Sequence, residues 1–267
     1  MEYHEFPLTS PLSDYIQTMW AMQSENEHDG YPKSQIMPDG IVEVIFHYET
    51  PLYTYQDDSR FRQPENFAIS MMRKFIEIES TGKSGFISVR FFPWGAHHFF
   101  DTLVKDFLDQ TVDGSVLWGE RSKEIIANLK RCSNLEERVE LIKSFLTECL
   151  HKYRKDDSAA DEAIRFVRNS KGLLSIEEIC DHTGLSKKQL ERKFLSTVGT
   201  TPKIFSRISR FLNLCKHLEQ FKDKTLTELA HDCGYYDQAH FIKEFREFSG
   251  YTPKEFFTKE NVFFSEI

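Results

Sequence analysis

The sequence lacks the features that would place a protein in a membrane or outside the cell. No uninterrupted apolar run among its 267 residues approaches the roughly 20 residues that span a bilayer. Its first residues are acidic and lack the basic, then apolar order of a signal peptide. Hydrophobic residues make up 40% and charged residues 28% of the chain, which is the profile of a soluble globular protein. We therefore expect a cytoplasmic protein with no membrane partner.

Cysteine is also sparse, and its spacing argues against two kinds of site. The five cysteines are widely scattered and include no C-x₂-C pair. This pattern argues against a disulfide framework and against a structural zinc site. We expect buried free thiols and no cofactor; the cysteines are Cys132, Cys149, Cys180, Cys215 and Cys233.

The chain has no excess of positive charge, since its formal net charge is −8. Residues 1–157 carry 17 Lys and Arg against 26 Asp and Glu, whereas residues 158–267 carry 17 against 16. The acidity thus belongs to the first part, and the second part is free to present a local basic surface. This charge distribution permits nucleic-acid binding but does not demand it.

Short runs separated by turns in the first hundred residues predict an antiparallel β sandwich or barrel. Residues 41–48 follow a Pro-Asp-Gly turn, residues 75–79 alternate apolar and polar, and residues 86–92 follow a Thr-Gly-Lys turn. From about Ala96 the apolar period changes from two to about 3.6, which predicts flanking helices.

One predicted helix carries an apolar stripe that allows two interpretations. The stripe either packs on its own barrel or forms the seam of a homodimer, and fewer than three heptads do not decide between them. Its members are spaced four, three, four and three residues apart: Leu135, Val139, Ile142, Leu146 and Cys149. A polar linker follows at residues 152–158.

An internal repeat of about fifty residues organises the last hundred residues. Residues 176–185 align with residues 226–235 at an offset of 50. Farther along the offset becomes 51, so that Leu190 aligns with Phe241, and both copies end in Gly-x-x-Pro. One residue has therefore been gained where the turn of the second copy meets its next helix.

Each copy has the pattern of a helix-turn-helix. A short helix begins at an S/T-x-x-E capping box, and Gly184 or Gly234 supplies the left-handed backbone that ends it. The next helix begins at a polar cap, Ser186 or Asp237, buries one apolar pair and leaves its other face polar. This second helix is free to enter a major groove of DNA.

Residues 203–221 are predicted to form one helix between the copies. About 18 residues at 1.5 Å each span roughly 27 Å, whereas successive major-groove faces lie roughly 34 Å apart. A rigid arm of this length would set the two units in neighbouring grooves if the DNA bends.

These features resemble the DNA-binding domain of the AraC/XylS family of transcription regulators. The second unit matches the family signature from Gly234 to Phe245 and on to Pro253, and the first unit matches it from Leu185 to Phe194. The resemblance covers residues 158–258. It implies seven helices, of which the third and sixth read bases, and RNA polymerase as a partner if the protein is an activator.

The resemblance assigns residues to DNA position by position. Base-reading residues are Lys188, Glu191, Arg192, Gln238, Ala239, His240 and Lys243. Arginine suits guanine, glutamine suits adenine, and lysine serves guanine or phosphate. Glu191 would either accept a hydrogen bond from cytosine or repel the DNA backbone, and His240 would either enter the groove or stay on the surface without a partner. Basic residues on phosphate or on solvated surface are Lys187, Lys193, Arg207, Arg210 and Arg246.

The first domain resembles an uncharacterised cupin-like domain that often precedes such readers. Residues 37–46 and 85–96 carry this resemblance, which implies a sensing or dimerising module. We expect a pocket between sheet faces, lined by aromatic residues, with Arg90 or Glu43 as the polar anchor for a small-molecule effector.

The alternatives are a ligand-binding protein with a helical accessory domain and two enzyme classes. A cupin-type metal-dependent enzyme would use His47, His97, His98 and Glu43 as ligands. Adjacent residues of a strand point to opposite faces, so His97 and His98 could not both bind one metal, and we expect neither a metal nor an enzyme. The DNA-repair methyl acceptors, which can carry a similar reader, need a zinc-held cysteine cluster that this sequence lacks.

The sequence thus predicts an α+β protein in three parts. A cupin-like sensing domain covers residues 1–118, a helical dimerisation or linker segment covers 119–157, and an all-α DNA-binding domain covers 158–267. The predicted function is sequence-specific transcription regulation, in which two helices dock in adjacent major grooves of double-stranded DNA. The N-terminal part would sense a ligand, form a homodimer, or both.

Overall fold

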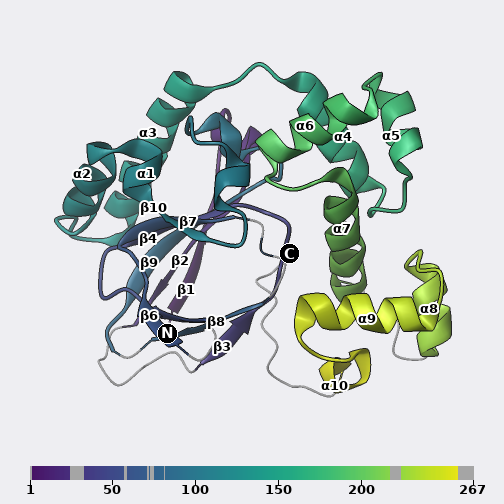
Figure 1. Ribbon diagram of the computed structural model, residues 1–267. Coiled ribbons are helices and arrows are strands. Elements are labelled where there is room, and N and C mark those ends of the chain that lie inside the picture. Colours follow the sequence, from purple (N-terminus) through teal and green to yellow (C-terminus); the bar gives the residue numbers. More distant parts are fainter. Residues whose placement is uncertain are drawn as a thin grey trace.

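The computed structural model describes residues 2–24, 33–56, 59–70, 72, 75–80, 82–216 and 224–257. The first part of the chain, up to residue 157, contains the strands and three α-helices, and the second part, from residue 158, is helical; the two parts stand side by side in Figure 1. The predicted α+β class is confirmed. None of the described helices combines the length and the apolar character needed to cross a membrane.

The strands of the first part form two antiparallel sheets. The larger sheet has the order β1-β2-β9-β4-β7-β10 and the smaller one the order β3-β8-β5-β6. The strands are β1 Glu2–Phe6, β2 Ile16–Gln23, β3 Ser34–Ile36, β4 Glu43–His47, β5 Tyr53–Gln56, β6 Ser59–Arg62, β7 Asn66–Ile69, β8 Ile76–Glu79, β9 Gly85–Phe91 and β10 Thr111–Asp113. The predicted strands correspond to β4, β8 and β9, whereas β10 lies where helix was expected, because three residues carry no readable period.

Strand β9 is buried along its whole length, because the larger sheet has a core on both faces. Ile87, Val89 and Phe91 pack with the helices of the first part. Phe86 lies in a second cluster that also contacts Ile78 of the smaller sheet. Side chains alternate along a strand, so Ser88 and Arg90 share the face of Phe86.

Three helices cover the other face of the larger sheet: α1 Gly114–Trp118, α2 Glu120–Leu129 and α3 Leu135–Tyr153. All five members of the predicted apolar stripe are buried in this core. The stripe therefore packs on its own sheet and does not form an exposed dimer seam.

The second part of the chain is helical, and its described residues include seven helices. They are α4 Ser158–Asn169, α5 Ile176–Thr183, α6 Lys187–Thr197, α7 Pro202–Lys216, α8 Leu226–Asp232, α9 Gln238–Ser249 and α10 Pro253–Phe257. Helix α7 runs between the two repeated units (Figure 1). The rest of the predicted connecting helix, residues 217–221, lies outside the described residues.

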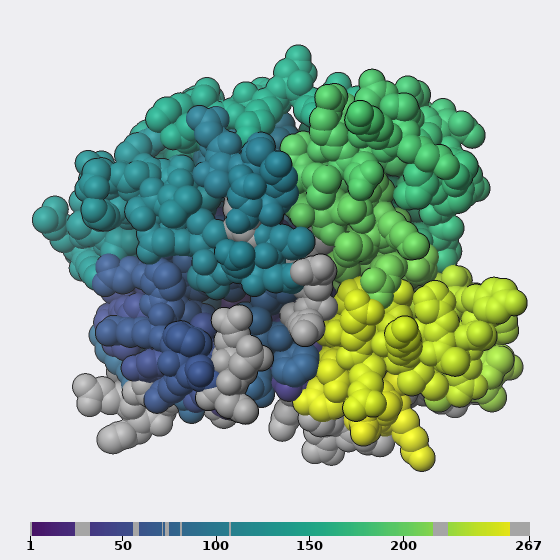
Figure 2. Space-filling model, in the orientation of Figure 1, coloured from purple at the N-terminus to yellow at the C-terminus, as the bar shows by residue number. Residues whose placement is uncertain are grey.

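One of the hydrophobic clusters contains residues of both parts, and Figure 2 shows the two parts in contact. Met37 and Trp94 of the first part are buried within the core cluster of the helices. The guanidinium of Arg165 lies 3.7 Å from the centre of the Trp94 ring. Short 3₁₀ helices complete the first part at η1 Leu12–Asp14, η2 Ala96–His98 and η3 Val104–Phe107.

The adjacent histidines His97 and His98 do not lie on a strand, so the geometric reason for excluding a shared metal is wrong. They end η2, where the backbone curls, and their ring centroids are 3.9 Å apart. Both side chains therefore point into the same space. Of the five cysteines, Cys149, Cys215 and Cys233 are buried as expected, whereas Cys132 and Cys180 are partly exposed; all five are free thiols.

Candidate nucleic-acid interface

The first repeated unit consists of α5 and α6. Helix α5 ends at Gly184, whose φ of +67° is left-handed, as the turn requires. Ser186 then caps α6 and forms a capping box with Gln189. Leu190 and Phe194 on α6 are fully buried. The helix is thereby fixed by one face, and its other face remains open.

The second unit, α8 and α9, repeats this arrangement with one extra residue. Gly234 has a φ of +73°, and the carboxylate of Asp237 caps α9 by accepting a 2.7 Å hydrogen bond from the backbone N–H of His240. Two residues separate Gly234 from this cap, whereas one separates Gly184 from its own. The longer turn includes Tyr236, whose side chain is 87% exposed, an aromatic group that the repeat alignment did not single out.

The predicted base-reading residues lie on the open faces of α6 and α9. Those on α6 are exposed: Lys188, Glu191 and Arg192. Ala239, His240 and Lys243 on α9 are exposed, and Gln238 is partly buried. The side-chain oxygen of Gln238 accepts a 2.9 Å hydrogen bond from Thr227, so its amide N–H groups keep their donor capacity.

The five predicted backbone contacts differ in their surroundings. Lys187 pairs with Glu177, and Lys193 pairs with Asp157. Arg246 is exposed on α9. The basic side chains of these three residues lie on the same helices as the base readers, but two of them already have a carboxylate partner.

Arg207 and Arg210 on α7 are directed into the protein. Arg207 donates 2.6 Å hydrogen bonds to Glu244 and Glu247. Arg210 donates to the carbonyl of Gly172 at 3.1 Å and lies 3.9 Å from Glu244. A phosphate would have to compete with these contacts.

The sequence reasoning gave no role to Glu244, the residue that holds these arginines. Its side chain is only 1% exposed, although it is a carboxylate in the middle of α9. The signal was present, because Phe241, Phe245 and Phe248 mark the inward face of α9 and residue 244 falls on it. The network ties the second reading helix to α7.

A pocket of about 260 Å³ lies between the first part and the helices α4 and α7. Its charged lining consists of Asp39, Arg90, Arg168 and Lys171. Arg90 and Asp39 form a 2.6 Å ion pair, and the Nε of Arg90, a side chain 3% exposed, has no hydrogen-bond partner among the described residues. The pocket lies between the two parts of the molecule, whereas the sequence predicted one between sheet faces.

The two predicted ligand anchors are neighbours, but only Arg90 lines this pocket. Glu43 and Arg90 pair across β4 and β9, and the Ser88 hydroxyl donates to Glu43. Burial raises the pKa of Glu43 and of Asp39, although the Arg90 guanidinium acts in the opposite direction on both. Burial likewise lowers the pKa of Arg168. These shifts indicate a site where an unpaired charge destabilises the protein, because burial removes its hydration.

Comparison with known proteins matches the two parts of the chain separately. Residues 179–259 match the family model described as a helix-turn-helix domain, and residues 4–113 match a domain of unknown function, DUF6597. The HTH-type transcriptional activator RhaS of Escherichia fergusonii is 33% identical over 82 residues, which are 31% of this chain and 29% of RhaS. The HTH-type transcriptional regulator ArgR of Pseudomonas aeruginosa is 25% identical over 143 residues, 53% of this chain and 41% of ArgR.

The chain therefore spans less than half of the length of either curated relative. Among solved structures, ToxT from Vibrio cholerae is similar with a TM-score of 0.44 and 12% identity, over 91% of this chain and 97% of that chain. The chain therefore carries a helix-turn-helix domain at residues 179–259 and, ahead of it, a domain of unknown function at residues 4–113.

Proposed function

We propose that this protein is a sequence-specific DNA-binding transcription regulator and not an enzyme. The observation that carries the proposal is the pair of helix-turn-helix units with their polar faces exposed on α6 and α9. The regulators RhaS and ArgR, which resemble the helical part, support it. It would act on double-stranded DNA in the cytoplasm.

We assign base reading to residues on the open faces of the two helices. Arg192 is suited to a bidentate contact with guanine and Gln238 to one with adenine, while Lys188 and Lys243 serve guanine or phosphate. We assign Lys187, Lys193, Arg246 and the exposed Tyr236 to phosphate contacts. Arg207 and Arg210 are assigned to the DNA backbone only if they leave Glu244.

Helix α7 sets the distance between the two readers. Its described residues, Pro202–Lys216, span about 22 Å at 1.5 Å per residue, and successive major-groove faces lie roughly 34 Å apart on one side of DNA. Readers set closer together than this spacing would fill both grooves only if the DNA bends.

The first part of the chain contacts the corner that follows each reading helix. A Cβ on Gly199, after α6, would lie 2.9 Å from the carbonyl oxygen of Val104 in η3. After α9, a Cβ on Gly250 would lie 2.3 Å from the ring of Phe75, and the Tyr251 hydroxyl donates a 2.7 Å hydrogen bond to Gln35 of β3. Movement of the first part would thus change the spacing of both readers, which supports control of DNA affinity by this part.

The pocket between the two parts is where we place a small-molecule effector. Arg90, Arg168 and Lys171 outnumber Asp39 in its lining, so it favours an anionic ligand. Such a ligand would bridge β9 and α4 and so bias the contact between the parts. A thermal-shift screen of small carboxylates and phosphates tests this: a stabilising ligand should lose its effect in Lys171→Ala and keep it in Lys105→Ala. Equal stabilisation of both variants would place the ligand elsewhere.

Homodimerisation through the first part and contact with RNA polymerase remain proposals for an activator. Because the α3 stripe is buried, a dimer would need another surface, such as the exposed edge strand β1. Sedimentation of the full chain at micromolar concentration distinguishes monomer from dimer.

The function is tested by binding of the full chain to promoter fragments in the presence of random competitor DNA. The proposal expects at least one fragment to be retained at a competitor excess that removes all others. A variant with Arg192→Ala and Lys243→Ala should lose this preference, whereas Lys123→Ala on α2 should keep it. Equal binding to all DNA by the wild type would reject the proposal.

A further inference from the structure

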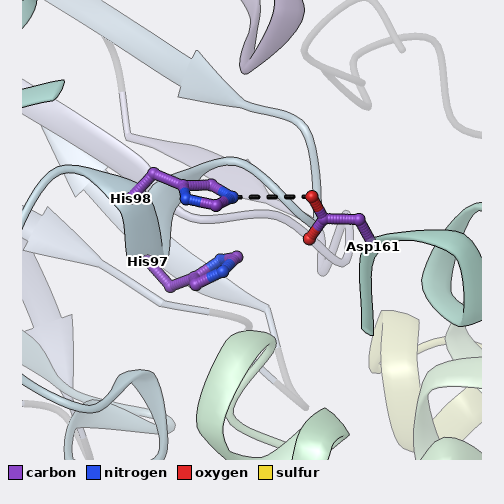
Figure 3. A group of neighbouring side chains, drawn as sticks. All are labelled: His97, His98 and Asp161. Carbon is purple, nitrogen blue, oxygen red and sulfur yellow. Dashed lines mark ion pairs between the residues drawn. The ribbon is translucent and has the colours of Figure 1, made fainter. Parts of the chain in front are cut away.

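A group of metal-ligand side chains lies where the first part meets α4 (Figure 3). His97 and His98 end η2, and Asp161 projects from the first turns of α4 toward them. The Nε2 of His98 is 3.5 Å from an Asp161 carboxylate oxygen. One potential ligand atom from each of the three residues lies within 4.8 Å of the others.

Several polar atoms of this group are buried without a hydrogen bond of standard geometry. His97 is 3% and His98 is 2% exposed. Both ring nitrogens of His97, Nε2 of His98 and one oxygen of Asp161 lack a hydrogen bond of standard geometry to any described residue. The Trp94 backbone is a weak hydrogen-bond partner of the His97 ring. Four such atoms in one place destabilise the folded state, because each loses its hydration by water and gains no hydrogen bond of standard geometry in exchange. Each neutral imidazole offers one lone pair and the carboxylate offers more, so an ion that accepts electron pairs would satisfy one atom of each residue.

We propose that His97, His98 and Asp161 bind one divalent transition-metal ion of the Zn²⁺ class. Two imidazoles and one carboxylate form a donor set that suits Zn²⁺ and its borderline neighbours. Zn–N bonds of 2.0–2.1 Å place tetrahedral ligands roughly 3.3 Å apart. The ligand atoms of His98 and Asp161 are already 3.5 Å apart. Metal binding would therefore require mainly the His97 ring to move. Three protein ligands leave a fourth position for water.

The ion would join two elements that are far apart in the sequence. His97 and His98 belong to the first part of the chain, whereas Asp161 lies in the helix that opens the second. An ion there would cross-link the first part to α4, close to the linker of residues 154–157.

Metal binding would break one existing hydrogen bond, and the loss of that bond can be measured. The Nδ1 of His98 accepts a 3.1 Å hydrogen bond from the backbone N–H of Lys155, which leaves the ring proton on Nε2. Coordination through Nε2 moves that proton to Nδ1, and Lys155 then loses its acceptor. Metal binding should therefore increase the deuterium exchange of the Lys155 amide while the ion holds α4 and η2 together.

The test is titration of the chelator-stripped full chain with Co²⁺, whose visible absorption reports tetrahedral coordination, followed by displacement with Zn²⁺. The proposal expects one Co²⁺ per chain with a tetrahedral spectrum. Asp161→Asn should weaken binding by more than about 100-fold, because loss of an outer-shell partner alone costs roughly 10–100-fold. Asp161 is partly exposed, so this variant should fold even if His97→Ala does not.

Matched controls are Asp181→Asn on α5 and His151→Ala on α3, which should bind as the wild type does. If Asp161→Asn binds Co²⁺ as tightly as the wild type, or if His151→Ala abolishes binding, the ion lies elsewhere and the proposal is overturned. Absence of tetrahedral Co²⁺ from the wild type, or unchanged exchange of the Lys155 amide on loading, would overturn it too. None of these results depends on DNA binding.

Discussion

The two helix-turn-helix units have the same backbone plan but opposite charges at the position that anchors each reading helix. At the offset of 51, Lys193 of α6 corresponds to Glu244 of α9. Lys193 pairs with Asp157 at the partly exposed start of α4. Glu244 is buried against Arg207 of α7. A repeat can thus keep its fold while each copy is tied to a different neighbouring helix.

The units also differ in their aromatic cores. Within the described residues, the ring of Phe245 in the second unit contacts those of Phe211, Phe241 and Phe256. Its counterpart Phe194 has a ring contact with Phe205. We therefore expect the second unit to depend more on its buried anchors than the first.

The largest expected effect comes from removing these rings. Phe245→Ala should lower the free energy of unfolding by about 3–5 kcal/mol, with Phe194→Ala at the lower end, because both leave a cavity in a packed core. Urea unfolding followed by far-UV circular dichroism measures both, and Tyr236→Ala on the exposed turn should have little effect. A larger loss of unfolding free energy in Phe194→Ala than in Phe245→Ala would show that the first unit depends more on its buried ring.

The anchoring charges come next. Glu244→Ala should cost about 2–3 kcal/mol, less than a fully buried pair because Arg207 keeps Glu247 and is partly exposed. Lys193→Ala should cost less than about 1 kcal/mol, as partly exposed pairs do. The same unfolding assay compares them, and Glu244→Gln tests whether charge or shape matters. Equal costs for Glu244→Ala and Lys193→Ala would contradict the difference in anchoring.

Low pH should destabilise the first part of the chain more than the two helix-turn-helix units. His47 lies in the buried face of the larger sheet beside Gln63, and burial lowers its pKa from 6.5 to about 4. As the pH falls below 6.5, the unfolded chain takes up the proton first, so the stability present above this pH is lost progressively down to about pH 4. At about pH 5 the loss should be roughly 2 kcal/mol, partly offset by Asp39 and Glu43, whose raised pKa favours the folded state in acid.

The three tryptophans, Trp20, Trp94 and Trp118, all lie in the first part, so their fluorescence reports its unfolding. His47→Gln should flatten the pH dependence of the urea midpoint measured by this signal, and His151→Gln on α3 should leave it unchanged. An unaltered pH dependence in His47→Gln would contradict the assignment.

The smallest expected effects concern DNA. Arg192→Ala and Lys243→Ala should each weaken specific binding about tenfold and relax selectivity at one site, as loss of a good base contact does. Glu191→Ala should strengthen binding about twofold by removing repulsion, an effect of the size of an exposed charge contact. Fluorescence anisotropy at fixed salt measures all three. Weaker binding by Glu191→Ala would instead make Glu191 a base reader.

The sequence predicted local structure better than contacts between distant segments. The capping residues Ser175, Ser186, Thr225 and Asp237 were correctly placed, because a cap depends on three or four neighbouring residues. The strands β4 and β9 were also found, because alternation is a local signal. Their pairing brought Glu43 beside Arg90, which sequence distance could not show.

The misplaced features depend on the packing of the two parts against each other. The sequence argument against a metal shared by His97 and His98 used strand geometry, but the chain has already turned into η2 at these residues. The pocket was expected within the sheets because its partner wall, formed by Arg168 and Phe205, is far along the chain. Glu244 was missed because a single polar residue on an apolar helix face is normally counted as a break in the pattern.

Selection of bound sequences from random DNA by the wild-type chain tests the central claim most directly. The account predicts two short conserved elements about one helical turn apart, with Arg192→Ala relaxing one element and Lys243→Ala the other. Enrichment of no sequence over the starting pool, or relaxation of the same element by both variants, would contradict a protein that reads DNA with two separate helices.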